Sequence, residues 1–437
     1  MEATSTTSSG IAELLVIKDQ LIGAIDQLVA SGIELPSINE PNPSLAPPHP
    51  AVGMACAYAE QLQAVLQGPL RSIEKSLAFH VPACLRVALE AHVSETLREA
   101  AEKGKPALHV DEIAKSSNIN PRKLARVLRL LAAHHIFREV KPDVFTRNRC
   151  STSLDTGKSV ADLTVADALF KGASYLTESL LDPATSPSEA SVDCGVARAY
   201  GIKNPMFEFW GEPEHDGTRR KFANAMRGFS ALFGGDAGLL EGYPWAALKE
   251  GATVVDVGSG VGAVSLPVAK SVPHIKLILQ DRKEVVEKEA LDLWNAEAPQ
   301  ELESGRVKLM QHDFFTEQPV KGADVYMMRG TIHNWDDPNA LKILKRLAEA
   351  ASASSRFLLI EQALTHLAPP QPFPPPTTLP YIMDLQMLVA CPGMERTTEQ
   401  YEELGAKAGW KLRKIWRTGP EGNDVGWRHY EFELAEK

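Results

Sequence analysis

Short apolar segments alternate with helix-length amphipathic segments along the chain from Gly251 onwards. Apolar runs rich in β-branched and aromatic residues, bounded by turn residues, predict β-strands. Seven segments fit this description: TVVDVG, IKLILQD, RVKLMQHD, ADVYMMRG, RFLLIEQ, KLRKIWRTG and WRHYEFEL. The early segments show no polar alternation, which is typical of parallel strands covered by helices on both faces. The predicted fold class is therefore α/β, a doubly wound, Rossmann-like domain.

The last two strand segments are separated only by the short stretch PEGNDVG. A connection of this length suits an antiparallel hairpin, whereas parallel strands need a long crossover. We therefore expect a seven-stranded sheet whose last strand is antiparallel. Another insertion, residues 368–380, is rich in proline and predicts a surface loop.

The N-terminal half is predicted to be mainly helical. Residues 11–30 place apolar side chains at helical spacing, and the proline-rich stretch 36–50 then forms an extended tether. This first helix would pack on another subunit or on a later domain. Residues 109–137 outline a helix-turn-helix, and β-prone runs flank Lys141-Pro142-Asp143 as a hairpin, so the whole resembles a winged helix.

Four regions follow from this pattern. We expect a helical arm with its tether at 1–50, a winged-helix-like domain at 51–160, a helical linker at 161–250 and the α/β domain at 251–437. In the linker, KFANAMRGFSALF predicts an amphipathic helix and GEPEHDG a loop.

Composition narrows the class of protein. The chain has 437 residues, 44% of them hydrophobic and 23% charged, as in an ordinary globular protein. No apolar stretch is long enough to span a membrane, and the N-terminus does not resemble a secretory signal, so we expect a cytoplasmic protein. Its five cysteines show no C-x-x-C pair, which favours neither a disulfide framework nor a zinc site.

The first strand of the α/β domain runs into a glycine-rich loop. Gly258 and Gly260 allow a ligand to approach main-chain amides, and Asp281 ends the next strand where a carboxylate can bind a ribose diol. These features alone fit a nicotinamide dinucleotide as well. Asp256 lies at the strand end, where it would repel a pyrophosphate but attract an ammonium group, and this favours S-adenosylmethionine.

The third strand adds to this pattern. Asp313 and Phe314 follow it directly, an acceptor for an adenine amino group beside a ring able to stack on the base. The alternative for Asp256 and Asp313 is helix capping.

The motifs DVGSGVG, QDRKEVVE, HDFF, PVKGADVYMMRGTIHNWDD and MERTTEQYEEL resemble those of the small-molecule O-methyltransferases of plant and fungal secondary metabolism, the caffeic acid O-methyltransferase type. The resemblance extends from about residue 70 to the end of the chain. It implies cofactor contacts by Gly258, Asp281, Asp313, Phe314 and Arg329. Ser259 replaces a glycine that is common in the family's loop.

A candidate general base follows the fourth strand. His333 lies at the carboxyl end of the sheet, where such folds bind ligands, and histidine is well matched to removing a proton from a phenol. The resemblance implies that His333 is the base and that Glu361 and Glu395 flank and orient it. Carboxylates around an imidazole hold its tautomer and raise its basicity. Asn334 replaces the family's usual aspartate.

The resemblance also implies which residues contact the substrate. Met226 and Met387 match the family's substrate-lining positions, and thioethers and rings can hold a flat aromatic acceptor. Further candidates for the lining are Phe222, Phe229, Trp210 and Asp384. Apart from the two methionines, core packing is an equal alternative for these residues.

A second reading concerns the basic helix of the helix-turn-helix. Arg122, Lys123, Arg126 and Arg129 could contact a DNA backbone, as in a transcription regulator. The formal net charge of −10 opposes this. The resemblance instead implies that the winged-helix domain mediates dimerisation and closes the partner's active site.

We therefore predict a homodimeric O-methyltransferase. It would transfer a methyl group from S-adenosylmethionine, leaving S-adenosylhomocysteine, to the hydroxyl of a small aromatic substrate, without a metal, a nucleic-acid partner or a membrane. The alternatives are an enzyme of the same fold that catalyses a pericyclic, cyclisation or decarboxylation step, and the DNA-binding regulator.

Overall fold

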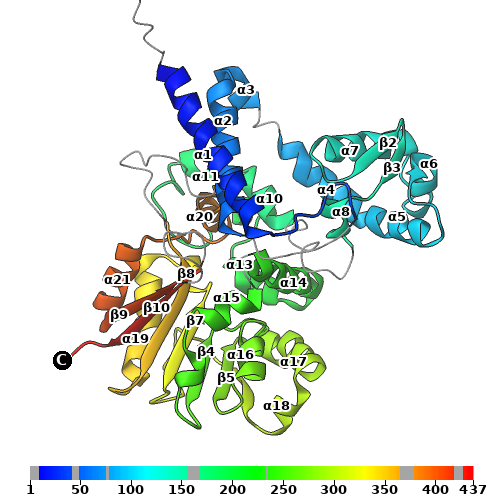
Figure 1. Ribbon diagram of the computed structural model, residues 1–437. Helices are drawn as coiled ribbons and strands as arrows, with labels where there is room; N and C mark the ends of the chain where they lie inside the picture. The colour runs from blue at the N-terminus through cyan, green and yellow to red at the C-terminus, as the bar shows by residue number, and fades with distance from the viewer. Residues whose placement is uncertain are drawn as a thin grey trace, which may run out of the picture. The chain divides into compact units, whose positions relative to one another are not determined.

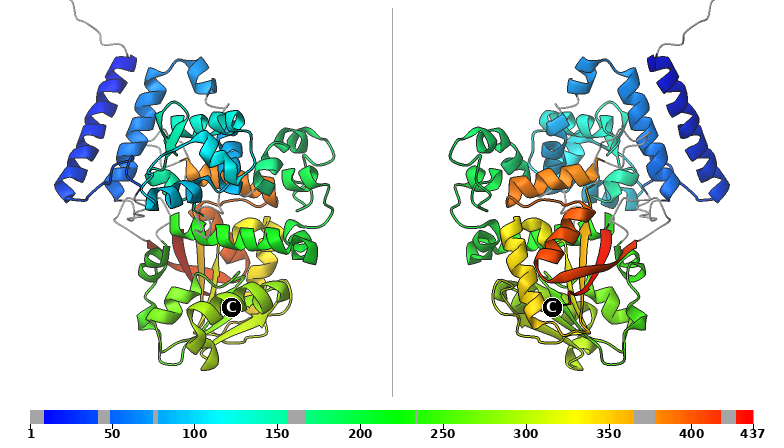
Figure 2. Two further views of the ribbon diagram at one scale, coloured as in Figure 1. Left: turned by 90° about the vertical axis from the view of Figure 1, so that its right-hand side faces the viewer. Right: turned by 90° about the vertical axis from the view of Figure 1, so that its left-hand side faces the viewer.

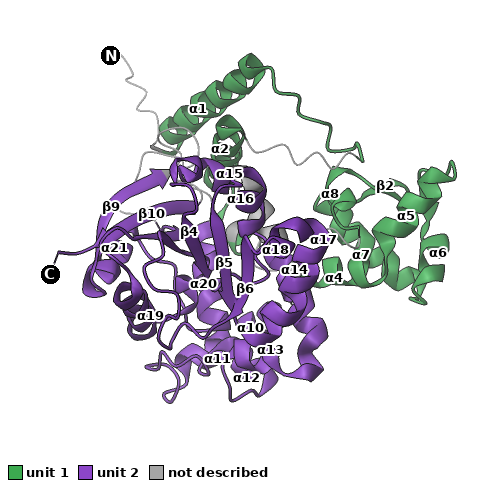
Figure 3. Ribbon diagram, turned by 90° about the horizontal axis from the view of Figure 1, so that it is seen from below, with its two compact units in different colours: residues 1–165, 367–377 green, residues 166–366, 378–437 purple. Residues whose placement is uncertain are grey.

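The computed structural model describes residues 9–41, 49–74, 78–155, 167–232, 235–364, 378–417 and 427–436. Two compact units make up the chain (Figure 3), and each is described by itself. Unit 1 comprises residues 1–165 and 367–377, and unit 2 comprises residues 166–366 and 378–437. The stretch PEGNDVG and the predicted proline-rich loop up to residue 377 lie outside the described residues.

Unit 2 contains a seven-stranded sheet in the order β6-β5-β4-β7-β8-β10-β9 (Figures 1 and 3). The strands are β4 (Thr253–Val257), β5 (Lys276–Asp281), β6 (Val307–Gln311), β7 (Val325–Arg329), β8 (Arg356–Gln362), β9 (Trp410–Arg417) and β10 (Trp427–Leu434). Only β10 is antiparallel to its neighbours, β8 and β9. The predicted fold class and the antiparallel last strand are thus confirmed.

Helices cover both faces of this sheet, as the apolar strands require (Figure 1). One face forms a core with α15 (Gly235–Glu241), α16 (Ser265–Ser271) and α17 (Leu291–Glu297). The other face forms a core with α19 (Asp337–Ala350) and α21 (Thr398–Lys407). Because helices cover both faces of the sheet, a ligand can reach the strands only at their ends, and in such folds it binds at the carboxyl ends.

The remaining helices of unit 2 form a separate apolar cluster. They are α10 (Asp167–Ala173), α11 (Leu176–Leu181), α12 (Gly195–Tyr200), α13 (Met206–Gly211), α14 (Asp216–Leu232) and α20 (Leu379–Ala390), with α18 (Pro299–Glu303) and η5 (Val285–Ala290) beside the sheet. The predicted loop GEPEHDG is wrong in part. Pro213 starts the short helix η3 (Pro213–His215), and α14 begins at Asp216, because proline and aspartate suit the first turn of a helix as well as a loop.

Unit 1 combines a helical hairpin with a winged helix (Figures 1 and 2). Its helices are α1 (Ser9–Ser31), α2 (Pro50–Leu66), α3 (Pro69–Glu74), α4 (His80–Glu90), α5 (Val93–Glu102), α6 (Val110–Ile113), η2 (Ala114–Ser116), α7 (Pro121–Ala133) and α8 (Arg149–Thr152). The strands β1 (Leu108–His109), β2 (Arg138–Lys141) and β3 (Val144–Thr146) form a small sheet in the order β1-β3-β2. Among the described residues, no helix is both long and apolar enough to cross a membrane.

The helix-turn-helix is built as its residues predict. Asn120 accepts a hydrogen bond from the Arg122 amide at 3.0 Å, and Pro121 occupies the first position of α7. Arg129 forms ion pairs with Glu139 at 3.3 Å and with Asp143, both from the β2–β3 hairpin. One of the four predicted DNA contacts is therefore already paired within the domain.

Candidate active site

The glycine-rich loop connects β4 to α16 and is fixed to the neighbouring strand. The amides of Gly258 and Ser259 donate to the Gln280 carbonyl at 2.8 and 3.0 Å. The Gly260 amide donates to Asp281 Oδ2 at 2.7 Å. Gly258 and Gly260 both have positive φ, +73° and +55°, a conformation that glycine adopts readily. The two predicted glycines and Asp281 thus form one hydrogen-bonded group.

Gly258 allows three separate segments to meet. A Cβ atom at this position would lie 2.9 Å from Thr331 Cγ2 and 3.6 Å from a Phe314 ring carbon. Only a glycine leaves space between the loop, the end of β6 and the end of β7. The loop backbone at Gly258 has no side chain that would block a ligand, and the Phe314 ring and the carboxylates of Asp256 and Asp281 belong to the same edge of the sheet. This combination fits a nucleoside that carries an amino acid.

Asp256 is a buried carboxylate beneath the loop. Its Oδ2 accepts a hydrogen bond from Ser265 Oγ at 2.6 Å. Burial and the neighbouring Asp281 raise the pKa of Asp256 to about 7, although Ser265 and Arg329 oppose this. Burial also raises the pKa of Asp281. A positive ligand group would favour the charged form of both carboxylates, which agrees with the predicted preference for an ammonium group.

Arg329 ends β7 at the same edge of the sheet. Its guanidinium lies 4.3 Å from the centre of the Trp427 ring, a cation–π contact. Burial lowers the pKa of Arg329 to about 10, while Glu361 and Asp256 oppose this shift. Arg329 is therefore a buried positive charge that partly balances the acidic residues around it.

Asp313 and Phe314 follow β6 as predicted. Asp313 is exposed, and its Oδ1 accepts the Phe315 amide at 3.0 Å, so this oxygen caps a turn. The Phe314 ring packs edge-to-face against Phe315 and Trp335, with centroids 5.1 and 5.8 Å away. The turn therefore fixes Phe314 next to Gly258.

His333 lies in the short helix η6 (Ile332–Asn334), directly after β7, and is buried. Its Nδ1 lies 2.7 Å from Glu395 Oε1 and 3.7 Å from Glu361 Oε2. The structure thus brings together the three residues predicted to form the catalytic group. The contact with Glu395 is a hydrogen bond that fixes the orientation of the ring.

Glu361 holds the backbone as well as facing the ring. Its Oε1 accepts the amides of Thr331, Ile332 and His333 at 2.9, 2.8 and 3.3 Å. Its Oε2 is buried and has no hydrogen-bond partner. Glu361 thus closes the turn that carries the histidine and leaves a negative oxygen beside it.

Glu395 reaches His333 because the segment after α20 lies against the His333 backbone. The Met394 amide donates to the His333 carbonyl at 2.9 Å, and the Glu395 amide donates to Asp384 Oδ1 at 2.9 Å. A Cβ atom on Gly393 would lie 2.1 Å from the His333 carbonyl oxygen. Sequence reasoning missed Gly393, whose only signal is its place two residues before Glu395.

Electrostatics make the His333 imidazole a stronger base than an ordinary histidine. Burial by itself would lower its pKa, but the charges of Glu395 and Glu361 outweigh burial and raise the pKa to about 9. Burial raises the pKa of Glu361 above its ordinary value, opposed by His333. The two carboxylates therefore favour the protonated form of His333.

Asn334, which stands where the resembled family has aspartate, bonds locally. Its Nδ2 donates to the Gly330 carbonyl at 3.4 Å, and its Oδ1 lies 3.8 Å from the Cys391 thiol. These contacts connect the histidine turn to the end of α20.

The predicted substrate residues are only partly clustered. Trp210 and Met387 are buried in one apolar cluster, and the ring of Phe222 lies 5.0 Å from that of Trp210. Met226 is 41% exposed. The side chain of Phe229 lies outside the described residues. The substrate contacts of these residues remain predictions.

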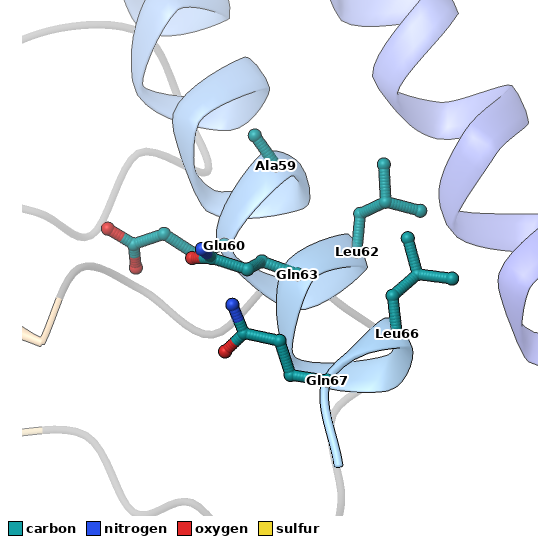
Figure 4. Close-up of a pocket in the computed structure, with 6 residues that line it drawn as sticks. All are labelled: Ala59, Glu60, Leu62, Gln63, Leu66 and Gln67. Carbon is teal, nitrogen blue, oxygen red and sulfur yellow. The ribbon is translucent and has the colours of Figure 1, made fainter. Parts of the chain in front are cut away.

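Two groups of side chains have the spacing of metal ligands among the described residues. One is the triad His333, Glu361 and Glu395, and the other is Glu212, Glu214 and His215. In the triad, His333 Nδ1 and Glu395 Oε1 are joined by a hydrogen bond. A shallow hollow elsewhere, on α2 of unit 1, involves none of the predicted site residues (Figure 4).

Comparisons with known proteins agree with this geometry. An O-methyltransferase domain model matches residues 181–411, and an O-methyltransferase dimerisation domain model matches residues 73–157. An O-methyltransferase of Armillaria gallica is 34% identical over 84% of this chain and 85% of its own. The 4-O-methyltransferase 1 of Phanerochaete chrysosporium is 32% identical over 95% of this chain and 97% of its own.

A solved structure shows the same fold. OxaC in complex with S-adenosylhomocysteine and oxaline has 21% identity and a TM-score of 0.77, and the match covers 98% of this chain and 100% of that one. The chain therefore belongs to the O-methyltransferase family and is an S-adenosylmethionine-dependent O-methyltransferase. Its dimerisation domain indicates a homodimer.

Proposed function

We propose that this enzyme methylates a phenolic hydroxyl of a small aromatic secondary metabolite, with His333 as the general base. The observation that carries the proposal is the buried hydrogen bond of 2.7 Å between His333 Nδ1 and Glu395, at the carboxyl end of β7. This bond leaves Nε2 as the ring nitrogen that can accept the substrate proton. The relatives' O-methyltransferase names support the type of reaction.

The cofactor would lie along the carboxyl edge of β4, β5 and β6. S-adenosylmethionine supplies the methyl group, which its sulfonium makes electrophilic. Asp256 would attract the amino group, Asp281 the ribose hydroxyls, and Asp313 with Phe314 the adenine. The bare backbone at Gly258 and Gly260 provides the close approach, and the positive charge of Arg329 balances the carboxylates.

The raised pKa of His333 suits this substrate class. A phenol has a pKa of about 10, so proton transfer to a base of ordinary pKa is unfavourable by more than 3 pKa units, or about 5 kcal/mol. With the pKa of His333 at about 9, the difference falls to about 1 unit, or about 1.4 kcal/mol. Glu361 and Glu395 therefore make His333 a stronger base, but they also lower the fraction of His333 that is neutral at pH 7 and able to accept a proton.

The substrate would be held by Met226, Met387, Phe229 and Trp210, with Asp384 acting on Glu395 through its hydrogen bond. Thioethers and rings provide flat, polarisable contacts to an aromatic acceptor. We propose that no metal takes part, because methyl transfer from a sulfonium needs little beyond alignment and a base, and Glu395 already orients His333 for that role.

The test is replacement of His333 by alanine, assayed with labelled S-adenosylmethionine on a panel of phenols. We expect kcat/KM to fall by about 10²- to 10⁴-fold, the usual contribution of general base catalysis. The affinity for S-adenosylhomocysteine, measured by calorimetry, should stay within about twofold, because His333 would not bind the cofactor. His134→Ala changes an exposed histidine on unit 1 and serves as the control.

Retained methyl transfer in His333→Ala would reject His333 as the base. Turnover without label in any product would reject methyl transfer itself. Loss of activity in EDTA that added metal restores would reject the metal-independent mechanism.

A further inference from the structure

Three buried oxygen atoms of unit 2 have no hydrogen-bond partner among the described residues. They are Oε2 of Glu361, Oε2 of Glu395 and the hydroxyl of Tyr401. All three residues are at most 3% exposed. A buried polar atom without a partner destabilises the folded protein, and a charged one does so most. We therefore looked for what satisfies the three atoms.

Helix α21 carries Tyr401 to the face of the sheet on which Glu361 lies. The Tyr401 ring packs on that of Tyr430, with centroids 5.3 Å apart. Tyr430 lies opposite Leu359 in the pairing of β8 with β10, and Leu359 and Tyr401 belong to the same apolar core. Because side chains alternate along a strand, Glu361 points to the same face as Leu359. Tyr401 and Glu361 thus share the layer between α21 and the sheet.

The start of α21 is fixed to the turn that carries His333. Arg396 lies two residues before this helix, is buried, and donates to the Ile332 carbonyl at 3.3 Å. Glu395 directly precedes Arg396, and its Oε1 forms the hydrogen bond with His333 Nδ1. One short segment therefore brings both Glu395 and Tyr401 towards the histidine turn.

The charges around Tyr401 agree with this placement. Burial raises the pKa of Tyr401 well above its ordinary value, and the negative charges of Glu361 and Glu395 raise it further. The other charged or titratable groups that face Tyr401 are Arg396 and Tyr430. Those that face the two carboxylates are His333, Arg329 and Asp384. A protonated tyrosine hydroxyl is a donor, whereas an ionised carboxylate only accepts, so the three unpaired oxygens are complementary.

We propose that Tyr401 is a positioning residue of the catalytic group, joined to Glu361 and Glu395 through one buried water molecule. The water accepts a hydrogen bond from the Tyr401 hydroxyl and donates one to Oε2 of each glutamate. Buried waters typically make about three hydrogen bonds to otherwise unpaired polar groups. One molecule therefore satisfies all three atoms, while Oε1 of each glutamate keeps its contacts with His333 and its backbone.

This link keeps both glutamates ionised. A hydrogen bond donated to a carboxylate favours its charged form. Without the hydroxyl, Glu361 takes up a proton more readily, because burial already raises its pKa. A neutral Glu361 no longer raises the pKa of His333, so the pKa of His333 falls. The consequence for catalysis rests on the proposed function of His333 as the base, whereas the link itself does not.

Tyr401→Phe in the full-length enzyme tests the proposal, because it removes the hydroxyl and keeps the ring. The pKa of His333 is read by NMR on protein with ¹³C-labelled histidine, and its signal is assigned by its loss in His333→Ala. We expect this pKa to fall by about one pH unit, and the inflection of kcat/KM to move with it. Tyr326→Phe is the matched control. Tyr326 is buried in the same core, but its hydroxyl donates to the Val320 carbonyl at 2.7 Å, so the pKa of His333 should stay unchanged.

An unchanged or raised pKa of His333 in Tyr401→Phe would overturn the proposal. The titration needs no turnover, so its result is separate from the test of His333 as the base. Urea unfolding gives a second measurement: losing a bonded hydroxyl should lower the midpoint, whereas a higher midpoint would show an unpartnered hydroxyl and overturn the link. A crystal structure of the wild-type enzyme should show the water in contact with the three oxygens. Its absence, or a metal ion in its place, would overturn the proposal as well.

Discussion

Glu395 determines how strong a base His333 is. Its carboxylate is buried and lies 2.7 Å from His333 Nδ1, and together with Glu361 it raises the pKa of the imidazole to about 9. Because only the neutral imidazole accepts a proton, kcat/KM of the wild-type enzyme should rise with pH and level off above about pH 9. The free enzyme's essential base is the group that this profile reports.

Glu395→Gln should move this profile to lower pH. The amide keeps the size of the side chain but removes the charge that favours the imidazolium, so the pKa of His333 falls. At high pH, where His333 is neutral in both enzymes, the variant should be about 10- to 100-fold slower, since a weaker base accepts the substrate proton less readily. A pH series of kcat/KM checks both effects. A profile that keeps the wild-type inflection would contradict the role given to Glu395.

Gly393 is expected to set the position of Glu395. A methyl group at residue 393 would lie 2.1 Å from the His333 carbonyl oxygen, so Gly393→Ala must push the two segments apart. Overpacking of this kind costs about 1–3 kcal/mol of stability, measured by urea unfolding. We also expect a lower kcat, because the hydrogen bond between Glu395 and His333 lengthens.

Gly217→Ala is the matched control for this prediction. A Cβ atom at Gly217, in α14, meets nothing within 4 Å, so alanine there should leave kcat unchanged and stabilise the helix slightly. Equal losses of activity in both variants would show that Gly393 has no special role.

The residues of the catalytic group could be predicted from the sequence, whereas the contacts that hold them in position could not. His333 could be found because it follows a predicted strand, and Glu361 and Glu395 because the segments LLIEQ and MERT match the resembled family. The contacts of Gly393 with the His333 carbonyl, and of Asp384 with the Glu395 amide, join segments about 60 and 10 residues apart. No local pattern encodes such approaches, since they depend on how the elements pack.

Among the elements, α7 shows how local residues define a helix start. Asn120 caps the helix by accepting the Arg122 amide, and Pro121 fits the first turn without losing a hydrogen bond. Asn120→Ala should lower the free energy of unfolding by about 1 kcal/mol, as for other caps. Asn120→Asp keeps an acceptor and should be close to wild type. Chemical denaturation of both variants distinguishes capping from a general effect of substitution.

The type of an element could be predicted where its residues indicated only one kind of secondary structure. The run TVVDVG is rich in β-branched residues and, apart from Asp256 near its end, has no charged position, which predicts a buried strand; β4 is indeed buried along nearly its whole length. GEPEHDG was less informative because Pro and Asp favour turns and helix starts alike. In the structure, α14 begins at Asp216, so the end of this segment is the start of a helix and not a loop.

Charge is a property of the whole molecule, and it bears on the DNA-binding alternative. The chain has a net charge of −10, and of the basic residues on α7, Arg129 is paired with Glu139 and Asp143. Arg122, Lys123 and Arg126 are exposed. Three exposed cations on an acidic protein give few phosphate contacts, whereas DNA affinity requires several to release counterions.

We therefore expect no specific binding to duplex DNA at physiological salt, measured by fluorescence anisotropy on random and palindromic duplexes. Arg122→Ala combined with Arg126→Ala should leave both the anisotropy and methyl transfer unchanged. A regulator would behave differently: it would bind with an affinity that falls steeply with salt, and the double variant would reduce that slope by about 1 to 2 units. A loss of salt-dependent DNA affinity in the double variant would support α7 as a DNA-recognition helix.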